Sequence, residues 1–314
     1  MFSRMKTKIL GAPLDPMNNK VRHRLTLVAM LAWIGLGADA LSSSCYGPEE
    51  AYLALGANNH LAIFIAAITV LTVFIISFGY NQVIELFPSG GGGYKVASQL
   101  LHPYAGLVAG AALIVDYVLT IAISVAAGSD AIFSFLPHWM ASYKLYFSAA
   151  LIVFLLVINL RGTKEAIAVL APIFIGFIVV HVGLIVYGII AHADGLVSVI
   201  PDAVNETNIL AGSIGWFAVI GVMLHAYSLG SGTYTGIEAV SNNVQNLAEP
   251  RVLTGKRTML YMALSLSFMA GGLILLYLLW HAAPIPGKTL NAVVFQNMLG
   301  NSVMTQHFLL NLRH

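Results

Sequence analysis

Long apolar runs separated by short polar segments dominate the chain. A helix that crosses the roughly 30 Å hydrocarbon core of a bilayer needs about 20 apolar residues. Seven runs meet or approach this requirement, and they cover residues 25–56, 60–80, 105–127, 146–160, 166–191, 214–240 and 258–281. None of them alternates polar and apolar positions as the strands of a membrane barrel do. The pattern therefore predicts an all-α membrane protein with seven transmembrane helices.

The first and sixth runs each contain a stretch that is expected to interrupt the helix. The first stretch reads Asp39-Ala-Leu-Ser-Ser-Ser-Cys-Tyr-Gly-Pro48, and its serines, glycine and proline propagate a helix poorly. Pro48 suits the first turn of a new helix, which predicts a break near 42–47. The sixth run is interrupted by Ser228-Leu-Gly-Ser-Gly-Thr-Tyr-Thr-Gly236. Two interrupted helices five spans apart are typical of transporters built from inverted repeats, although structural kinks are the simpler alternative.

The composition supports a membrane protein. Hydrophobic residues make up 58% of the 314 positions and charged residues only 9%, against about 25% charged in soluble domains. This excludes a soluble enzyme or a nucleic-acid-binding protein. The single cysteine, Cys45, permits neither an intramolecular disulfide nor a zinc cluster. Residues 1–24 are polar and basic, so no cleavable signal peptide is expected.

The distribution of lysine and arginine predicts the orientation. Twelve of the 15 cationic residues lie before the first run or in every second loop after it. The remaining three are Lys144, Lys288 and Arg313. Positive residues favour the cytoplasmic side. We therefore expect a multi-pass protein of the cell membrane with a cytoplasmic N-terminus.

Two aspartates are predicted to lie deep in the bilayer. Asp39 is about 22 Å along the first span at 1.5 Å per residue, and Asp116 is near the middle of the third span. An ionised carboxylate is costly at that depth, so each should face a cavity and hold a cation or a proton. A hydrogen bond from Asp116 to a neighbouring helix is the structural alternative.

Hydroxyl groups extend both positions into stripes. Asp116, Thr120 and Ser124 are spaced i, i+4, i+8 and share one helix face. Asp39, Ser43 and Tyr46 are spaced i, i+4, i+7, although the break makes their geometry less secure. Both stripes offer only oxygen atoms, which suit potassium or sodium. Hydrogen bonds to the preceding helical turn, or close helix packing, are the alternatives for the serines and threonines.

Three further features give weaker signals. Glu238 opens the resumed sixth helix, where it either complements the helix dipole or serves as a gate or proton site. The run Pro88-Ser-Gly-Gly-Gly-Gly-Tyr94 lacks the lysine placement of a phosphate-binding loop and is interpreted as a flexible cytoplasmic turn. His181 and His225 lie within spans and are expected to be packing residues.

Several motifs resemble the amino acid–polyamine–organocation (APC) transporter superfamily, from about Gly11 to the end of the chain. They are Phe87-Pro-Ser-Gly-Gly-Gly-Gly-Tyr94, and Thr235-Gly-Ile-Glu-Ala-Val-Ser-Asn242 followed by Glu249-Pro-Arg. Within that superfamily, the stretch from Asp39 to Gly47 and Val115-Asp-Tyr-Val-Leu-Thr120 are most similar to the KimA-type potassium importers. The resemblance implies an APC/LeuT-like inverted-repeat bundle with interrupted first and sixth helices.

The resemblance also implies a function and a set of ligands. The function is proton-coupled potassium uptake by alternating access, without a cofactor. The implied cation ligands are Asp39, Tyr46, Asp116, Tyr117, Thr120, Ser124 and Thr235. Two carboxylates near one cation would both be ionised with potassium bound, and one would be protonated after it leaves. The expected partners are the lipid bilayer and potassium, and a homodimer is left open.

Compared with a bundle of two five-span repeats, the chain is expected to be incomplete. The expected parts are a cytoplasmic segment (1–24), a first five-helix repeat (25–191), two helices of a second repeat (192–281) and an extracytoplasmic segment (282–314). Because later spans complete the bundle, we predict that this chain alone does not transport. An amino-acid or amine permease of the same fold, and a non-transporting membrane scaffold, are the alternative functions.

Overall fold

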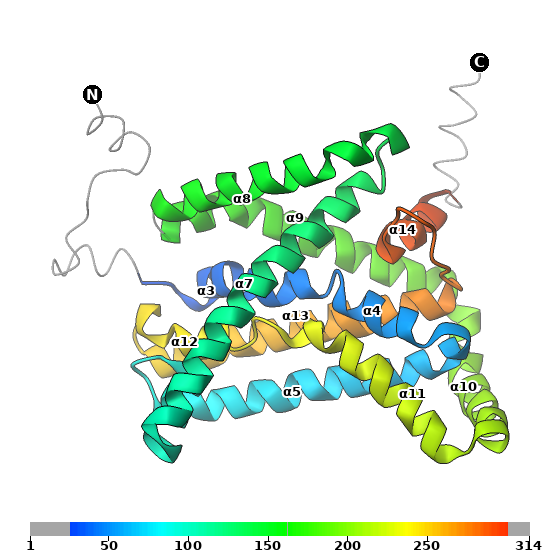
Figure 1. The fold of residues 1–314 in the computed structure, drawn as a ribbon, viewed down its shortest axis with the longest axis horizontal. Coiled ribbons are helices and arrows are strands. Elements are labelled where there is room, and N and C mark those ends of the chain that lie inside the picture. Colours follow the sequence, from blue (N-terminus) through cyan, green and yellow to red (C-terminus); the bar gives the residue numbers. More distant parts are fainter. Residues whose placement is uncertain (1–25, 162, 301–314) are drawn as a thin grey trace.

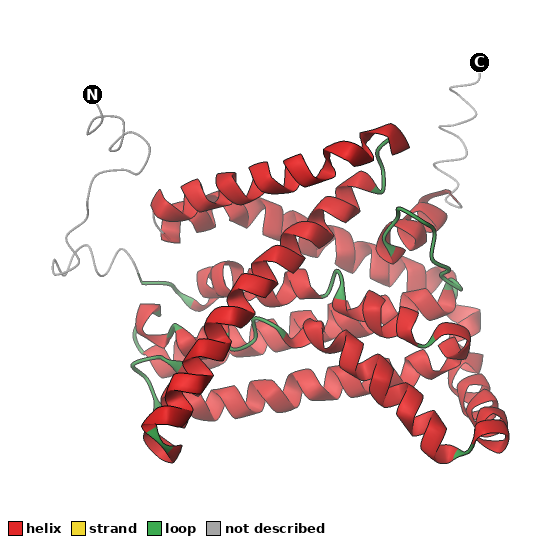
Figure 2. Cartoon of the chain, in the orientation of Figure 1, coloured by secondary structure: helices red, strands yellow, loops and turns green. Residues whose placement is uncertain are grey.

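The computed structural model describes residues 26–161 and 163–300 (Figure 1). Throughout these ranges the chain forms helices joined by loops and turns (Figure 2). The one extended pairing among the described residues is an isolated parallel bridge between Leu27 and Leu247. Leu27 donates its N–H to the carbonyl of Asn246 at 2.9 Å, which joins the entry of the first span to the entry of the seventh. The expected all-α class is confirmed.

Five of the predicted spans are long apolar helices. They are α5 (Ala62–Leu86), α7 (Pro103–Phe133), α8 (Lys144–Arg161), α9 (Thr163–Ala191) and α13 (Arg251–Leu279). The 3₁₀ helices η1 (Gly56–Leu61) and η3 (His138–Tyr143) precede α5 and α8. With η3 in front of it, the fourth span is longer than its apolar run predicts.

The first and sixth predicted spans are each divided. The first consists of α3 (Ala29–Ser43) and α4 (Gly47–Ala54), and the sixth of α11 (Trp216–Leu229), η4 (Gly230–Tyr234) and α12 (Ala239–Asn242). By length and composition, five described helices can cross a membrane, or six if the pair bent by 118° at residue 215 is one span. Helices α3 and α4 are each too short to cross a bilayer alone. The predicted seven transmembrane helices are therefore reached only if α3 and α4 together are counted as one further span.

Several shorter elements lie where the apolar runs predict only connections. They are α6 (Gly92–Val96), the π-helical turn η2 (Ala97–Leu101), α10 (Ala193–Ile214), η5 (Val244–Asn246) and α14 (Leu290–Gly300). Helix α10 buries Ala203, Thr207 and Ala211 along one face. This spacing of four residues makes a narrow apolar stripe rather than a continuous run. A search for long apolar runs therefore does not detect α10.

Helix α13 lies at the centre of the packing. It contacts α5, α3, α9 and α4, and 61% of its most apolar window is buried, against none of the corresponding window that contains α8. Small residues allow the close approach: a Cβ atom at Gly271 would lie 2.8 Å from Val70, and one at Gly272 would lie 2.7 Å from Ile185. Such small residues are common where membrane helices pack.

The connections alternate between the two ends of the bundle. Those joining α5 to α7, α8 to α9 and α12 to α13 lie at the end where α3 begins (Figure 1, left), and α4, α10 and α14 lie toward the opposite end. The first group contains the loops that are richer in lysine and arginine. One end of the bundle is therefore the more cationic.

The glycine-rich segment after α5 is docked rather than free. The Gly91 N–H donates to the carbonyl of Asn242 at 3.1 Å. Gly90, Gly91 and Gly92 all have positive φ angles, a conformation that other residues adopt only at a cost. A Cβ atom at Gly90 would lie 2.8 Å from the Asn242 carbonyl oxygen. The interpretation of this segment as a flexible turn is thus wrong in this structure, because its glycines allow it to lie against the end of α12.

Candidate functional site

The first break comprises Ser44, Cys45 and Tyr46, between α3 and α4. Pro48 occupies the first turn of α4, as its position in the sequence predicts. Proline has no N–H, so the Ser44 carbonyl cannot receive the hydrogen bond that would continue helix α3 into α4. Proline chemistry therefore accounts for the end of the first helix and the start of the second.

The second break is longer. After the 3₁₀ turn η4, Thr235 is extended and Gly236 has a φ angle of 89°. Glu238 lies at the N-cap position of α12, and its carboxylate accepts a hydrogen bond from the Gly236 N–H at 3.1 Å. The other Glu238 carboxylate oxygen is buried and has no hydrogen-bond partner. Glu238 thus holds the backbone of the break together and keeps one acceptor unused.

The two breaks lie directly against each other. The Ser43 hydroxyl donates to the Thr233 carbonyl, with 2.7 Å between the oxygens. A Cβ atom at Gly47 would lie 2.6 Å from the Thr233 nitrogen, and one at Gly236 would lie 2.7 Å from the Ala40 nitrogen. Helix α4 packs beside α11, and α3 packs beside α12. The interrupted spans are therefore antiparallel neighbours that meet at their non-helical segments.

Three acids from three helices interact electrostatically beside this contact. Asp39 of α3 interacts electrostatically with Asp116 of α7, and both interact with Glu238 at the start of α12. A Cβ atom at Gly236 would lie 2.8 Å from the Asp39 carboxyl carbon, which places that carboxylate against the second break. All three side chains are partly buried. Like charges held together in this way favour the presence of a cation or a proton.

Helix α7 contributes hydroxyl groups to the same region. Ser124 lies 3.4 Å from the Ser42 hydroxyl, measured between oxygens, and also interacts with the Tyr46 side chain. Thr120, one turn before Ser124, is buried. The Tyr117 hydroxyl accepts a hydrogen bond from the Asn242 side chain at 2.7 Å. These contacts join α7 to both interrupted spans.

A cavity of about 480 Å³ opens from the first break toward the end of the bundle where α14 lies. Tyr46, Glu49, Glu50, Asp130 and Thr289 are among the residues that line it. Glu49 accepts the Leu290 N–H at 2.9 Å, and Asp130 pairs with Lys144. The cavity therefore places Tyr46 and the carboxylates of Glu49, Glu50 and Asp130 along one lining.

The structure brings most of the predicted site residues together and gives one a different role. Asp39, Tyr46, Asp116, Ser124 and Glu238 form the group described above, which also includes Tyr117. The Ser43 hydroxyl is engaged by the Ala40 and Thr233 carbonyls and joins the two breaks. Thr235 lies in the extended part of the second break and is partly buried.

The sequence analysis does not identify two residues of this site, Ser42 and Asn242. Ser42 lies three residues after Asp39, a spacing that also shares a helix face, whereas the predicted stripe follows the four-residue spacing to Ser43. Asn242 lies in the motif that begins at Thr235, but nothing in a single sequence pairs it with Tyr117. The described residues contain no group of three or more His, Cys, Asp or Glu side chains arranged to hold a metal ion. A cation here would rely on hydroxyl and carbonyl oxygens as well as carboxylates.

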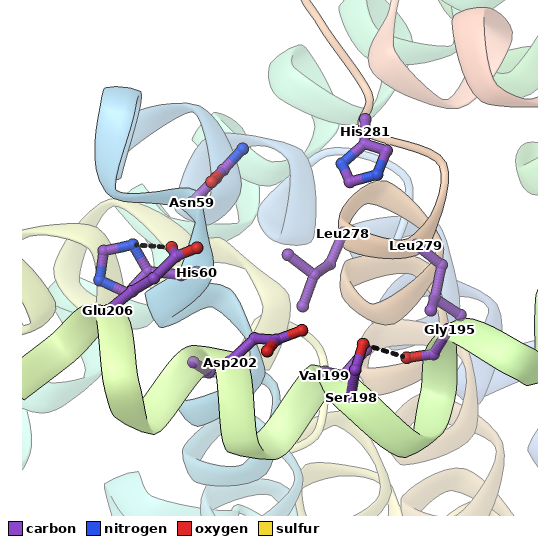
Figure 3. A pocket seen from close by; sticks show the side chains of 11 residues that line it. Asn59, His60, Gly195, Ser198, Val199, Asp202, Glu206, Leu278, Leu279 and His281 are labelled. Carbon is purple, nitrogen blue, oxygen red and sulfur yellow. Dashed lines mark hydrogen bonds and ion pairs between the residues drawn. The ribbon is translucent and has the colours of Figure 1, made fainter.

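A second pocket, of about 210 Å³, lies between α10, η1 and the end of α13 (Figure 3). His60 Nδ1 is 3.1 Å from a carboxylate oxygen of Glu206, and Ser198 donates to the Gly195 carbonyl at 3.2 Å. Asp202 and His281 also line it. None of the residues around the two breaks lines this pocket, so the two sites are separate.

Comparison with known proteins agrees with this architecture. The family profile described as Amino acid permease matches residues 26–312. The chain is 30% identical over 308 residues to the Potassium transporter KimA of Bacillus subtilis, an alignment that covers 96% of this chain and 49% of that protein. The chain thus spans about half the length of this curated relative. Such permeases are membrane transporters and not enzymes, and on the profile match the chain belongs to the amino acid permease family of the APC superfamily.

Proposed function

We propose that this chain forms the ion-binding half of a proton-coupled potassium importer of the cell membrane. The observation that carries the proposal is the electrostatic interaction of Asp39 with Asp116 beside the contact between two interrupted helices. Similarity to a protein named as a potassium transporter supports the choice of ion. The proposed ligands are Asp39, Tyr46, Asp116, Tyr117, Thr120, Ser124 and Thr235, and Ser43 supports them by joining the breaks.

Proton coupling follows from the proximity of the carboxylates. With potassium between them, both aspartates can remain ionised because the cation offsets their repulsion. When potassium leaves, the uncompensated repulsion is relieved if one carboxylate binds a proton. Glu238, with its unpartnered oxygen, is the proposed third participant in this exchange. Because potassium and the proton occupy these carboxylates in turn, release of one favours binding of the other, which would couple the movements of the two ions during alternating access.

Rubidium binding to the purified protein tests the proposal without requiring transport by this chain alone. Asp39→Asn and Asp116→Asn are each expected to weaken rubidium binding at least tenfold, because a charged ligand is lost. Asp194→Asn on the exposed face of α10 is the matched control. Undiminished rubidium binding in both site variants would overturn the proposal.

An amino-acid or amine permease is the second candidate, favoured by the family to which the chain belongs. A cationic amine could also bind between Asp39 and Asp116. Competition between labelled rubidium and labelled amino acids or polyamines for binding to the purified protein separates the two candidates. Binding of an amine that rubidium does not inhibit would favour the permease.

We further propose that the end of the bundle where α3 begins is cytoplasmic, because its loops carry most of the lysine and arginine. The test uses Cys45→Ser protein with one new cysteine. Ala141→Cys lies at the opposite end, and Gly93→Cys follows α5; both positions are exposed. An impermeant maleimide should label intact cells that carry the first variant and spare those that carry the second. The reverse pattern would invert the orientation.

A further inference from the structure

The backbone of the first break has an unusual arrangement of carbonyl groups. The Ser42 and Ser43 carbonyls accept the N–H groups of Cys45 and Tyr46, and the Tyr46 carbonyl accepts the N–H of Glu50. Among the described residues, no backbone or side-chain donor bonds to the Ser44 carbonyl, since proline occupies the position four residues later. The Cys45 carbonyl also lacks a helical partner. At membrane depth, such groups must be satisfied by protein or line a polar cavity.

The Cys45 carbonyl receives its hydrogen bond from outside both interrupted spans. The side-chain amide of Asn291, at the start of α14, donates to it at 3.1 Å. Asn291 is only 8% exposed. A buried polar side chain aimed at a freed backbone carbonyl contributes more than a surface contact, because neither group can turn to water instead.

A buried tyrosine fixes the direction of the Asn291 amide. The Tyr277 hydroxyl donates to the Asn291 side-chain oxygen at 2.5 Å, and Tyr277 is fully buried in α13. The Tyr52 hydroxyl of α4 in turn donates to the Tyr277 carbonyl at 3.2 Å. Because a backbone carbonyl can only accept, the amide nitrogen must face Cys45 and the amide oxygen must face the tyrosine. The network therefore closes in one orientation.

We propose that Asn291 is a positioning residue for the cation site. By engaging the Cys45 carbonyl, it holds the turn from Ser44 to Tyr46 in the conformation that leaves the Ser44 carbonyl and the Tyr46 side chain available to the ion. Helices α13 and α14, which supply none of the proposed ligands, thereby set the shape of the site. This inference rests on the proposed binding of a cation at the first break.

The test compares two variants and a control by rubidium binding to the purified protein. Asn291→Asp keeps the acceptor for Tyr277 but turns a carboxylate toward the Cys45 carbonyl, and Asn291→Leu removes both bonds. At neutral pH, each of these two variants should raise the rubidium concentration for half-maximal binding about tenfold, the effect of losing one buried hydrogen bond. The amount of rubidium bound at saturation should remain near that of the unmodified protein. Asn297→Asp on the exposed face of α14 is the matched control.

Acid pH gives a readout that a purely structural role would not alter. Protonation of the new carboxyl in Asn291→Asp restores a donor to Cys45, so its affinity, relative to the unmodified protein at each pH, should recover. That of Asn291→Leu should not recover. Unchanged affinity in both variants, or an identical response of both to pH, would overturn the inference. If neither variant folds, Tyr277→Phe should still raise the half-maximal concentration about threefold, and no change there would also overturn it.

The same variants separate this inference from the proposed function. If the unmodified protein binds no rubidium but binds an amine, the proposed potassium site is wrong, and the affinity of the Asn291 variants for that amine decides the role of Asn291. If the unmodified protein binds rubidium and the Asn291 variants bind it with the same affinity, only the role of Asn291 is wrong.

Discussion

The non-helical segments of the two interrupted helices are held by hydrogen bonds in different ways. The first break is three residues long. The hydroxyls of Ser42, Ser43 and Ser44 donate to carbonyls in the last turns of α3, and the Asn291 amide donates to the Cys45 carbonyl of the break. The second extends from Gly230 to Glu238 and takes a hydrogen bond from the first. The first break is thus held by its own sequence and by α14, whereas the second uses the first as a support.

This asymmetry predicts which contacts contribute most to stability and to rubidium binding. Changes at the surface shared by the breaks should disturb both, because the Ser43–Thr233 hydrogen bond and the close contacts of Gly47 and Gly236 join them. Changes remote from that surface should have small effects even where they remove a charge. The following substitutions test this order, from the largest expected effect to the smallest.

Gly47→Ala should be the most damaging. The new methyl group would collide with the Thr233 side chain and lie 2.6 Å from the Thr233 nitrogen, so backbone must move. We expect a loss of about 3 kcal/mol in the free energy of unfolding in detergent, together with loss of rubidium binding. Gly79→Ala in α5, where a Cβ atom meets nothing within 4 Å, is the control. Equal stability of the two variants would show that the breaks do not depend on close contact.

Gly236→Ala should cost somewhat less, about 2 kcal/mol. The φ angle of 89° disfavours any side chain, and the methyl group would approach Ala40 and the Asp39 carboxyl group. Gly287→Ala shares the positive φ angle, at 80°, but has open space, so it isolates the backbone contribution. Unfolding measurements on the pair give the cost of the contact by difference. A contact cost near zero would place Asp39 away from the second break.

Ser43→Ala should reduce stability by about 1 kcal/mol more than Ser44→Ala. Both serines are fully buried, but Ser43 bonds to the second break, and Ser44 bonds only to the Leu41 carbonyl of its own helix. Removing the Ser43 hydroxyl leaves the Thr233 carbonyl without that donor. Thermal unfolding of the two variants in one detergent measures the difference, and the opposite order would contradict the proposed support.

Glu206→Gln should change stability by no more than about 0.5 kcal/mol. The Glu206 side chain is 55% exposed, and glutamine can still accept a hydrogen bond from His60 (Figure 3). Rubidium binding should remain unchanged, because this pocket shares no lining residue with the region of the breaks. Asp202→Asn, in the same pocket, is the control. A large loss of binding in Glu206→Gln alone would mean that the two regions are coupled.

The sequence predicts the framework better than the detail. Continuous apolar runs reveal α5, α7, α8, α9 and α13, because a lipid-facing helix needs an uninterrupted length. Serine, glycine and proline reveal the two breaks for equally local reasons. The apolar runs do not predict α10 and α14, because an amphipathic helix or a short helix contains no such run.

The site shows the same limit. The cost of a buried charge predicts that Asp39 and Asp116 each face a cavity, and the family resemblance predicts that they share one site. By contrast, Ser43 and Ser42 are adjacent and both hydroxylated, and only the rotation of α3 decides which contacts the second break and which contacts Ser124. The role of Asn291 depends on a contact across 246 positions of the chain. No local pattern encodes such a contact.

Asn242 links helix α7 to the glycine-rich segment after α5. Its side chain bonds to Tyr117, the immediate neighbour of Asp116, while its carbonyl receives the N–H of Gly91. One residue therefore connects the third span to the glycine-rich segment through its side chain and its carbonyl. A displacement of α7 at Tyr117 would be transmitted through Asn242 to Gly91, about as directly as two hydrogen bonds allow.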